Sequence, residues 1–245
     1  MKQGLFEITR NSKIAKDTYE MVLCGDTSDV TTPGQFINIR LDGFFLRRPI
    51  SVCDCNPGTI TVIYKTVGEG TEKMSRMENG ERLDILSGLG NGYDTAKSGE
   101  FPLLIGGGVG VPPLFWLAKE LVKEGKKPSV ILGFNTRAEV FYEKEFDCAG
   151  GRVYIATADG SRGAKGFVTD VMKGLEGGYT YFYACGPEPM FRAVNDIAKT
   201  GGQFSFEERM GCGFGACMGC TCKTKYGSKR ICREGPVMER EEIIW

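Results

Sequence analysis

The sequence of 245 residues contains no histidine. Histidine is the commonest general acid and base and a frequent metal ligand, so its absence disfavours hydrolytic chemistry and histidine-ligated metal sites. The 31 basic and 31 acidic side chains leave no net charge, which gives no support for nucleic acid or an anionic membrane as a partner. The composition therefore argues against a histidine-based hydrolase and against a nucleic-acid-binding protein.

The sequence also lacks the apolar segments that export and membrane insertion require. The first ten residues, MKQGLFEITR, carry no apolar core of a signal peptide, and no apolar run approaches the length of a membrane span. We therefore expect a cytoplasmic protein without a membrane partner, in which the ten cysteines are reduced. Four isolated cysteines are expected to be small buried hydrophobic side chains: Cys24, Cys53, Cys55 and Cys148.

Up to about Gly92 the sequence has the pattern of short β-strands. The runs are rich in β-branched and aromatic residues, several of them alternate, and turn sequences such as TPG and NPG separate them. Six short strands at this spacing predict a small antiparallel barrel. The expected strands cover residues 5–9, 19–23, 35–41, 49–53, 59–65 and 82–86.

From residue 101 onward the pattern alternates between strands and helices. A buried strand runs into the loop GGGVGVPP over residues 106–113, and the helix that follows has its apolar residues on one face. This alternation predicts a parallel sheet with helices on both faces. Further strands are expected at 129–134, 153–157 and 179–184, and helices at 139–146, 167–175 and 188–199. The predicted domains are a barrel over 1–97, an α/β domain over 98–203 and a C-terminal module over 204–245.

Cysteines near the C-terminus have the spacing of an iron–sulfur site. Cys212, Cys217 and Cys220 form a C-x4-C-x2-C pattern and Cys232 follows on a later segment, as in a plant-type [2Fe–2S] ligand set. Interleaved glycines let the backbone curl around a cluster and aim N–H groups at its sulfurs. A structural zinc, which usually has cysteine pairs on both sides, and disulfide bonds are the alternatives. Cys222 in the same loop is expected to be a bystander.

Two loops of the α/β region are expected to bind a nucleotide. Gly108 and Gly110 stand where a strand meets a helix, and there N–H groups and the helix dipole can hold a pyrophosphate. Pro113 replaces the third glycine of the usual fingerprint, so a plain tight turn is the alternative. The stretch ACGPEPM over 184–190 lies at the carboxyl end of another strand, where such sheets bind ligands. A proline-capped helix start is the alternative there.

Together these motifs resemble the ferredoxin–NAD(P) reductase superfamily, in which a front barrel binds flavin and a back domain binds nicotinamide. Its G-x-G-x-x-P and C-G-P-x-P-M motifs match residues 108–113 and 185–190, and its R-x-x-S/T flavin motif matches residues 48–51. The FAD contacts that the resemblance implies are Arg48, Pro49, Ile50, Ser51, Ile63, Tyr64, Lys65, Gly70 and Thr71. The NAD contacts that it implies are Gly108, Gly110, Cys185 and Gly186, with Cys185 near the nicotinamide, and Asp159 is a further expected NAD contact.

Physical roles can be assigned to some of these residues. Arg48 can neutralise the FAD pyrophosphate and Ser51 can hydrogen-bond the flavin edge. Tyr64 would pack on the cofactor, with core packing as the alternative. Asp159 favours the free ribose hydroxyl of NAD, whereas Arg137 or Arg162 could hold the 2′-phosphate of NADP. The resemblance favours NAD.

The C-terminal stretch E-R-M-G-C-G-x-G-A-C-x-G-C narrows the resemblance to the electron-transfer subunits of NAD-dependent dihydroorotate dehydrogenase B. This resemblance implies that Cys212, Cys217, Cys220 and Cys232 hold a [2Fe–2S] cluster. It implies an electron relay, in pyrimidine biosynthesis, between the FMN of a catalytic dihydroorotate dehydrogenase subunit and NAD, through the cluster and FAD. The partner is expected in a heterotetramer of two plus two chains. Alternatives are a related flavin and iron–sulfur NAD(P)H reductase subunit serving a ferredoxin or a hydrogenase, and a zinc-binding interaction protein.

Overall fold

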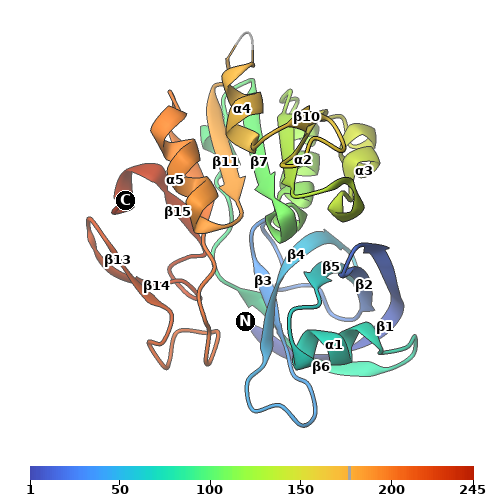
Figure 1. Cartoon of the computed structure of the whole chain (residues 1–245). Coiled ribbons are helices and arrows are strands. Elements are labelled where there is room, and N and C mark those ends of the chain that lie inside the picture. Colours follow the sequence, from blue (N-terminus) through green and yellow to red (C-terminus); the bar gives the residue numbers. More distant parts are fainter. Residues whose placement is uncertain (176–177) are drawn as a thin grey trace.

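The N-terminal strands close into a six-stranded antiparallel barrel in the order β1-β2-β5-β4-β3-β6 (Figure 1). The computed structural model describes residues 1–175 and 178–245. The barrel strands are β1 (Lys2–Ala15), β2 (Thr18–Cys24), β3 (Phe36–Ile39), β4 (Arg48–Asn56), β5 (Thr59–Lys65) and β6 (Arg82–Leu89). All six strands overlap those predicted from the sequence, so the predicted barrel is confirmed.

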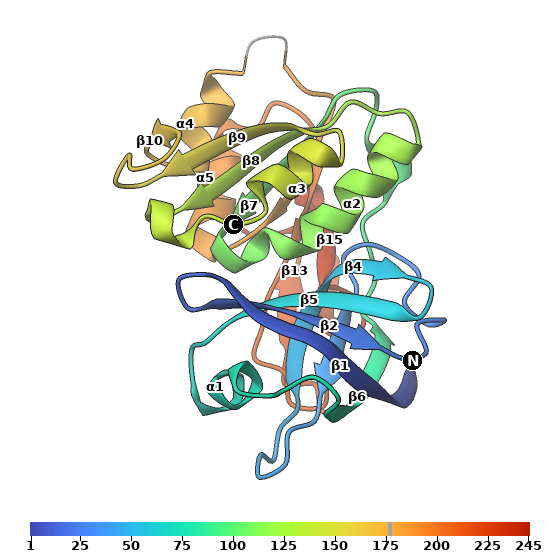
Figure 2. The same cartoon turned by 90° about the vertical axis from the view of Figure 1, so that its right-hand side faces the viewer.

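Alternation of apolar and polar residues explains why these strands close into a barrel. In β6, every second residue is buried, namely Leu83, Ile85, Ser87 and Leu89, while the residues that alternate with them are more exposed. Each fully buried Leu or Ile stabilises the fold by about 1.5–3 kcal/mol, so a strand with this pattern gains most by turning one face inward. The helix α1 (Glu69–Ser75), which comes between β5 and β6 in the chain, packs beside the barrel against β1 (Figure 2).

The second sheet has seven strands in the order β10-β9-β8-β7-β11-β12-β15. All neighbouring pairs are parallel except β12 and β15, which are antiparallel. Its strands are β7 (Pro102–Gly107), β8 (Ser129–Phe134), β9 (Arg152–Thr157), β10 (Ala164–Lys165), β11 (Tyr181–Cys185), β12 (Gly202–Ser205) and β15 (Val237–Glu239). The parallel sheet confirms the predicted α/β class.

Helices cover both faces of this sheet. Side chains of α2 (Pro112–Lys123) and α3 (Glu143–Cys148) share one core with β7 and β8. Side chains of α4 (Val168–Lys173) and α5 (Glu188–Ile197) share another core on the opposite face. Within the described ranges, no helix is both long and apolar enough to cross a membrane.

The structure differs from the sequence-based predictions at several places. The helix expected to begin at residue 139 begins at Glu143, because a 3-10 turn and the left-handed Tyr142, with φ of 63°, precede it. Cys24 and Cys148 are exposed, so the prediction that they are buried is wrong, whereas Cys53 is buried and Cys55 half-buried. Cys24 is the last residue of β2 and Cys148 the last of α3, and element ends face solvent more often than element centres.

The cysteine module is tied to both larger parts. It contains the hairpin of β13 (Thr221–Thr224) and β14 (Gly227–Arg230), and the chain then returns to the α/β sheet as β15. Cys220, Ile231 and Cys232 are buried together with Phe36 and Leu89 of the barrel. The predicted boundary at residue 203 falls inside β12, and β15 extends the sheet of the preceding domain.

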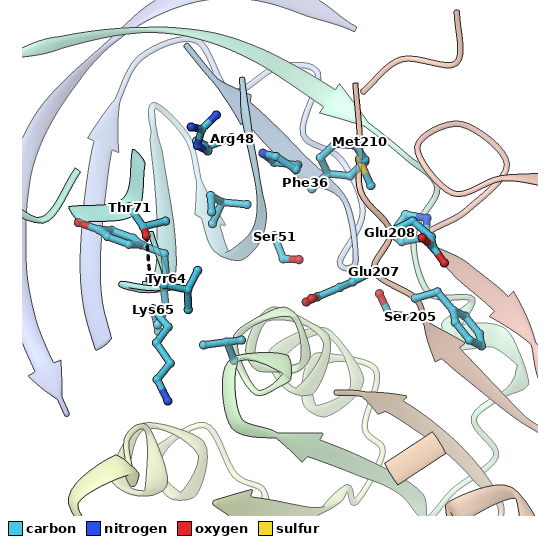
Figure 3. Close-up of a pocket in the computed structure, with 17 residues that line it drawn as sticks. Phe36, Arg48, Ser51, Tyr64, Lys65, Thr71, Ser205, Glu207, Glu208 and Met210 are labelled. Carbon is cyan, nitrogen blue, oxygen red and sulfur yellow. Dashed lines mark hydrogen bonds between the residues drawn. The ribbon is translucent and has the colours of Figure 1, made fainter. Parts of the chain in front are cut away.

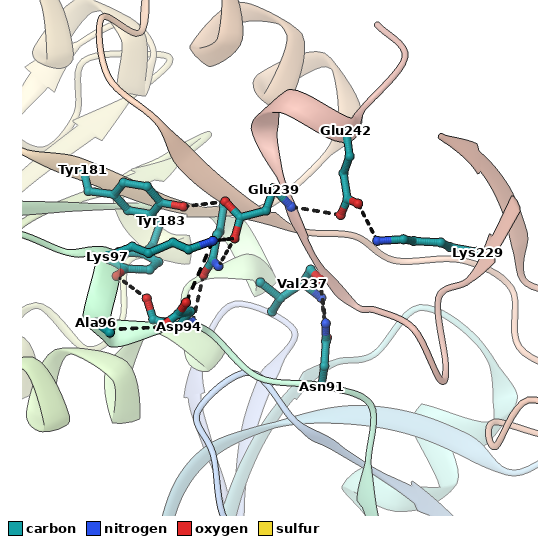
Figure 4. Close-up of polar contacts among 11 residues, drawn as sticks. Asn91, Asp94, Ala96, Lys97, Tyr181, Tyr183, Lys229, Val237, Glu239 and Glu242 are labelled. Atoms are coloured by element: carbon teal, nitrogen blue, oxygen red, sulfur yellow. Dashed lines mark hydrogen bonds and ion pairs between the residues drawn. The ribbon is translucent and has the colours of Figure 1, made fainter. Parts of the chain in front are cut away.

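Glu239 joins the returning strand to the centre of the sheet (Figure 4). Its carboxylate accepts hydrogen bonds from Lys97 Nζ at 2.7 Å, Gln203 Nε2 at 2.7 Å and Tyr181 OH at 2.8 Å. Burial alone would raise the pKa of Glu239, but these three donors outweigh it and the pKa lies below its usual value. Glu239 therefore links the interdomain segment, β11, β12 and β15 as a charged group.

We predict that Glu239→Gln lowers the melting temperature at neutral pH, because it removes a charge-assisted set of bonds and costs about 1–3 kcal/mol. A carboxyl with a lowered folded pKa stabilises the protein above its unfolded pKa, and this contribution is lost as the pH falls through the folded pKa. The difference between wild type and variant should therefore narrow below about pH 4. Thermal unfolding followed by circular dichroism at pH 7 and at about pH 3, below the usual pKa of a free Glu, measures this difference. The exposed neighbour Glu241→Gln is the control, and an equal deficit at both pH values would contradict the prediction.

Candidate functional site

A cavity of about 320 Å³ lies where the barrel, the α/β domain and the cysteine module meet (Figure 3). Strands β4 and β5 form one wall, and the segment after β12 forms the opposite wall. A second hollow adjoins the cavity through the shared residues Arg48, Val67 and Thr71. The two hollows are lined by every residue at which we expected an FAD contact: Arg48, Pro49, Ile50, Ser51, Ile63, Tyr64, Lys65, Gly70 and Thr71.

Arg48 faces both hollows and occupies the first position of β4. Its guanidinium lies over the ring of Phe44, 4.7 Å from the ring centroid. Gly70 leaves room for it, because a Cβ atom at Gly70 would lie 2.2 Å from Arg48 Nε. The neighbouring Arg47 is instead bound to Asp84 at 3.0 Å. A planar cation that faces a hollow, in a place that only glycine leaves open, fits the diphosphate of a dinucleotide.

Tyr64 belongs to the barrel core and to the cavity wall at the same time. Its ring stacks on Tyr19 with centroids 5.9 Å apart, and its hydroxyl donates a hydrogen bond to Asn11 Oδ1 at 2.9 Å. Burial raises the pKa of Tyr64 because the charged form loses water. Core packing and a cofactor contact were alternatives for this residue, and its position is compatible with both.

Part of the cavity wall was missed by the sequence analysis. These lining residues are Phe36, Val67, Val109, Ser205, Phe206, Glu207, Glu208, Met210 and Pro236. The signal for 207–210 was the stretch E-E-R-M, which we associated only with the cysteines that follow it. Glu207 is open to the cavity, yet the protein around it displaces water and raises the pKa of its carboxyl. The wall opposite the barrel therefore carries an acidic group.

The two nicotinamide motifs meet at the carboxyl ends of adjacent strands, β7 and β11. A Cβ atom at Gly110 would lie 2.2 Å from the carbonyl oxygen of Cys185, so only glycine lets the two loops touch. Gly186 is similarly tight against Met190, because a Cβ atom at Gly186 would lie 2.6 Å from the methyl carbon of Met190. Burial raises the pKa of the Cys185 thiol, and the nearby Glu207 adds to this shift. Gly110, Cys185 and Gly186 therefore lie in contact, with Gly108 in the same turn as Gly110, beside the cavity that Val109 lines.

Asp159 lies apart from this group, in the loop after β9. Its carboxylate accepts hydrogen bonds from the N–H of Ser161 at 2.9 Å and from Ser161 Oγ at 2.6 Å, and these bonds lower its pKa. Arg162, one of the two possible 2′-phosphate ligands, is bound to Glu143 at 2.8 Å. The backbone of Arg137, the other one, is held by Ser161. An NAD contact at Asp159 stays a prediction.

The four expected cluster cysteines approach one another in two pairs. The N–H of Cys212 points at Cys217 Sγ at 3.4 Å, and the N–H of Cys232 points at Cys220 Sγ at 3.5 Å. Ala216 N donates to Cys212 Sγ at 3.2 Å. Burial alone would raise the pKa of Cys212, but the surrounding N–H groups outweigh it and lower the pKa to about 6. Such donors stabilise a thiolate, which is the form that binds iron.

This pairing distinguishes between the metals considered above. Among the described residues, no three His, Cys, Asp or Glu side chains converge on a single metal position. Zinc needs four ligands around one ion, whereas a [2Fe–2S] cluster with four thiolates takes two of them on each iron. Two cysteine pairs therefore fit the cluster better than zinc. Cys222 lies on β13 outside both pairs, and burial raises the pKa of its thiol.

Arg230 holds the cysteine loop from within the module. Its Nη1 donates to the carbonyl oxygen of Gly215 at 2.6 Å, and its Nε donates to Glu234 Oε2 at 2.9 Å. Glu234 in turn accepts the N–H of Arg230 at 2.8 Å. The loop between the first two cysteines is thus fixed by a charged pair at the end of the β13–β14 hairpin.

A barrel with a flavin-type cavity, a nicotinamide-type loop pair and a module with paired cysteines define a reductase of the ferredoxin–NAD(P) reductase class that carries an iron–sulfur site. Comparison with known proteins narrows the class. Residues 104–196 match the oxidoreductase NAD-binding domain. Residues 207–244 match the iron–sulfur cluster binding domain of dihydroorotate dehydrogenase B.

Whole-chain relatives carry the same name. The chain is 43% identical to the dihydroorotate dehydrogenase B (NAD(+)), electron transfer subunit of Geobacillus sp. (strain WCH70), over 100% of this chain and 99% of that protein. It is 46% identical to the subunit of the same name from Fusobacterium nucleatum subsp. nucleatum, over 96% of each chain. The chain belongs to the family of dihydroorotate dehydrogenase B (NAD(+)) electron transfer subunits. This confirms the predicted family and the predicted oxidoreductase function in electron transfer.

A solved structure has the same fold over almost the whole chain. It is described as the NADH-dependent reduced ferredoxin–NADP oxidoreductase of flavin-based electron bifurcation. Its TM-score is 0.90 at 30% identity, covering 99% of this chain and 90% of that one. A flavohemoglobin from Malassezia yamatoensis with bound FAD and heme aligns with a TM-score of 0.69 at 19% identity, over 83% of this chain and 60% of that one, which shows the fold alone.

Proposed function

We propose that this chain relays electrons between NAD and a catalytic dihydroorotate dehydrogenase subunit, through FAD in the barrel cavity and a [2Fe–2S] cluster on the four paired cysteines. One observation carries the proposal. The segment that lines the cavity at Ser205–Met210 continues directly into Cys212, so one stretch of backbone borders the flavin-type cavity and supplies the first cluster cysteine. A segment that both lines the flavin-type cavity and supplies a cluster cysteine suits an electron path out of a flavin site.

The barrel residues account for the binding of FAD. Arg48 supplies a fixed positive charge for the diphosphate, and Gly70 keeps its guanidinium accessible. Ser51 and Lys65, on the adjacent strands β4 and β5, provide polar groups for the edge of the flavin ring, while Tyr64 provides an apolar wall. When bound, FAD exchanges a hydride with NAD(H) and single electrons with the cluster.

The α/β domain accounts for the approach of NAD. The turn of Gly108–Gly110 precedes α2 and would offer backbone N–H groups to the pyrophosphate, with Gly108 half-buried and Gly110 buried against Cys185; the helix itself begins with two prolines that need no N–H partner. Cys185 and Gly186 border the same loop from the end of β11. They would place the nicotinamide next to the flavin cavity, which Val109 lines from this loop. Asp159 would bind the ribose of NAD from the loop after β9.

The partner proposed for this chain is an FMN-containing catalytic subunit, in a heterotetramer of two plus two chains. Removing hydrogen from dihydroorotate needs a base beside the substrate carbon. This chain has no histidine, and its cavity residues are assigned to FAD. Electrons would therefore come from the partner and reach NAD through this chain. Phe214 and Met218 of the cysteine loop are 41% and 55% exposed, and we propose them as contacts with the partner.

The solved neighbour named for a ferredoxin–NADP oxidoreductase supports a second candidate, a reductase subunit that exchanges electrons with a ferredoxin. The same cavity and cysteine pairs would serve it. The two candidates differ in the protein that docks near the cluster, so a partner assay separates them.

We predict that replacing Cys212, Cys217, Cys220 or Cys232 by Ser removes the [2Fe–2S] cluster, because each substitution takes one of the two thiolates from one iron. Cys222→Ser is the matched control, since Cys222 lies in the same module outside the two pairs. Iron and sulfide analysis of protein purified without oxygen should give about two of each per wild-type chain. A filled site in Cys232→Ser together with an empty one in Cys222→Ser would show that the ligand set is wrong.

We predict that Arg48→Ala weakens FAD binding by about 1.5–3 kcal/mol, or about tenfold to a hundredfold, because a charge-assisted contact is lost. Titration of the flavin-depleted protein with FAD measures it, and the iron content should stay at the wild-type value. Arg76→Ala is the control, because Arg76 is an exposed arginine at the C-cap of α1. Unchanged FAD affinity in Arg48→Ala would place the diphosphate elsewhere.

We predict that the isolated chain oxidises NADH with an artificial one-electron acceptor and does not turn over dihydroorotate. Adding an FMN-containing dihydroorotate dehydrogenase catalytic subunit should give NAD-linked oxidation of dihydroorotate. Adding a ferredoxin in its place tests the second candidate. Turnover of dihydroorotate by the isolated chain would defeat the proposal, and electron exchange with the ferredoxin alone would favour the second candidate.

A further inference from the structure

Strand β3 contacts both the flavin-type cavity and the cysteine loop. Phe36 lines the cavity, and two residues further along the strand Asn38 reaches the loop. Residues two apart in a strand lie on the same face, so a single face of β3 carries both contacts. Asn38 Nδ2 donates a hydrogen bond to the carbonyl oxygen of Cys212 at 3.2 Å.

The contact between Asn38 and the loop is tight. Asn38 is 1% exposed. Gly213 has φ of 78°, in the left-handed region, and a Cβ atom there would lie 2.4 Å from Asn38 Nδ2. A side chain at Gly213 would thus collide with Asn38 as well as strain the backbone. In the described part of the chain, the bond to Cys212 is the hydrogen bond that joins the barrel strands to the loop of residues 211–220.

The side-chain oxygen of Asn38, Oδ1, argues against a role in packing alone. Because the carbonyl of Cys212 can only accept, the amide nitrogen of Asn38 must face it. Oδ1 is then buried with no hydrogen-bond partner among the described residues. An unpaired buried acceptor costs about 1–3 kcal/mol, which an apolar residue in the same strand would avoid. The polar side chain is therefore explained by its bond to the loop.

The loop is fixed on its other side by the module itself. Arg230 holds the carbonyl of Gly215 at 2.6 Å, within the module, whereas Asn38 holds the carbonyl of Cys212 from the barrel. Among the described residues, the bond from Asn38 is the hydrogen bond between the loop and the barrel, whose strands β4 and β5 form the cavity wall with the expected flavin contacts; the apolar contact of Cys220 with Phe36 and Leu89 lies beside it. Its loss would leave the cysteine pairs supported by the module and by this apolar contact, but would remove the directional contact that fixes the Cys212 side of the loop against the barrel.

We propose that Asn38 is a positioning residue, which fixes the Cys212 side of the cluster against the flavin cavity and so sets the rate of electron transfer between FAD and the cluster. This inference rests on the proposed function. The reaction concerned oxidises one NADH to NAD⁺ and a proton released to water, and its two electrons leave the flavin cavity one at a time through the cysteine loop to a one-electron acceptor, which is reduced twice. No covalent bond forms in that transfer, so the geometry of the two sites governs it.

The test compares Asn38→Ala and Asn38→Asp with Asn91→Ala in the whole chain, loaded with FAD and iron. Asn38→Asp keeps the shape of the side chain and removes the N–H donor. Asn91 is a matched control, because it also binds backbone of the module, at Val237 O at 2.8 Å and Val237 N at 2.9 Å, away from the loop. Rapid mixing with NADH follows flavin bleaching and cluster reduction separately, and electron paramagnetic resonance reports the environment of the reduced cluster.

In both Asn38 variants we expect flavin bleaching at the wild-type rate and cluster reduction slowed by about tenfold to a hundredfold, the usual cost of losing a group that orients a metal ligand. The resonance spectrum should change in both variants and stay unchanged in Asn91→Ala, because hydrogen bonding around the ligands tunes the cluster.

Wild-type spectra and rates in both Asn38 variants would overturn the inference, and so would equal changes in Asn91→Ala. Loss of iron from both Asn38 variants would also overturn it, because Asn38 would then serve assembly of the cluster. A wild-type chain without flavin or iron would defeat the proposed function itself, so the two failures are distinguishable.

Discussion

The antiparallel pairing of β12 with β15 is the constraint on which the arrangement of the site depends. Phe204 faces Met238 and Ser205 faces Val237 across this pair, so both ends of the cysteine module are held at one edge of the α/β sheet. The chain leaves this edge, forms a wall of the flavin-type cavity, builds the cysteine loop and must return to the same edge. The cavity and the cysteine pairs therefore lie next to each other because the chain runs directly from one to the other.

The barrel fixes the remaining freedom of the module. Phe36 and Leu89 are buried with Cys220, Ile231 and Cys232, so part of the core of the module belongs to the barrel. Removing apolar surface from water at this contact favours one docking position, and the tight fit of Gly213 on Asn38 makes that position specific. Three parts of the chain thus form a single functional unit, in which each part covers one side of the cavity.

An electron-transfer protein of this kind needs no histidine at its site. The groups at its site are fixed charges, backbone N–H groups, glycines that permit close approach and thiols. These groups position and polarise cofactors, and the cofactors supply the chemistry. The N–H groups around Cys212 lower the pKa of its thiol, whereas burial raises the pKa of Cys185, so the two cysteines suit different tasks. These opposite pKa shifts agree with the roles proposed for the two thiols, cluster ligand for Cys212 and neutral neighbour of NAD for Cys185.

The sequence by itself determined the six barrel strands, the alternating α/β elements and the grouping of the cysteines, because each depends on local periodicity or spacing. It also determined the expected FAD residues, which the two hollows bring together through the adjacent strands β4 and β5. Only the tertiary structure decided the opposite wall at Glu207, the edge strand β15 and the contact of Asn38 with Cys212. These features join segments far apart in the chain, and no local pattern encodes such a distance. The burial of Cys24 and Cys148 was mispredicted for the same reason, because exposure at the end of an element is set by what packs over it.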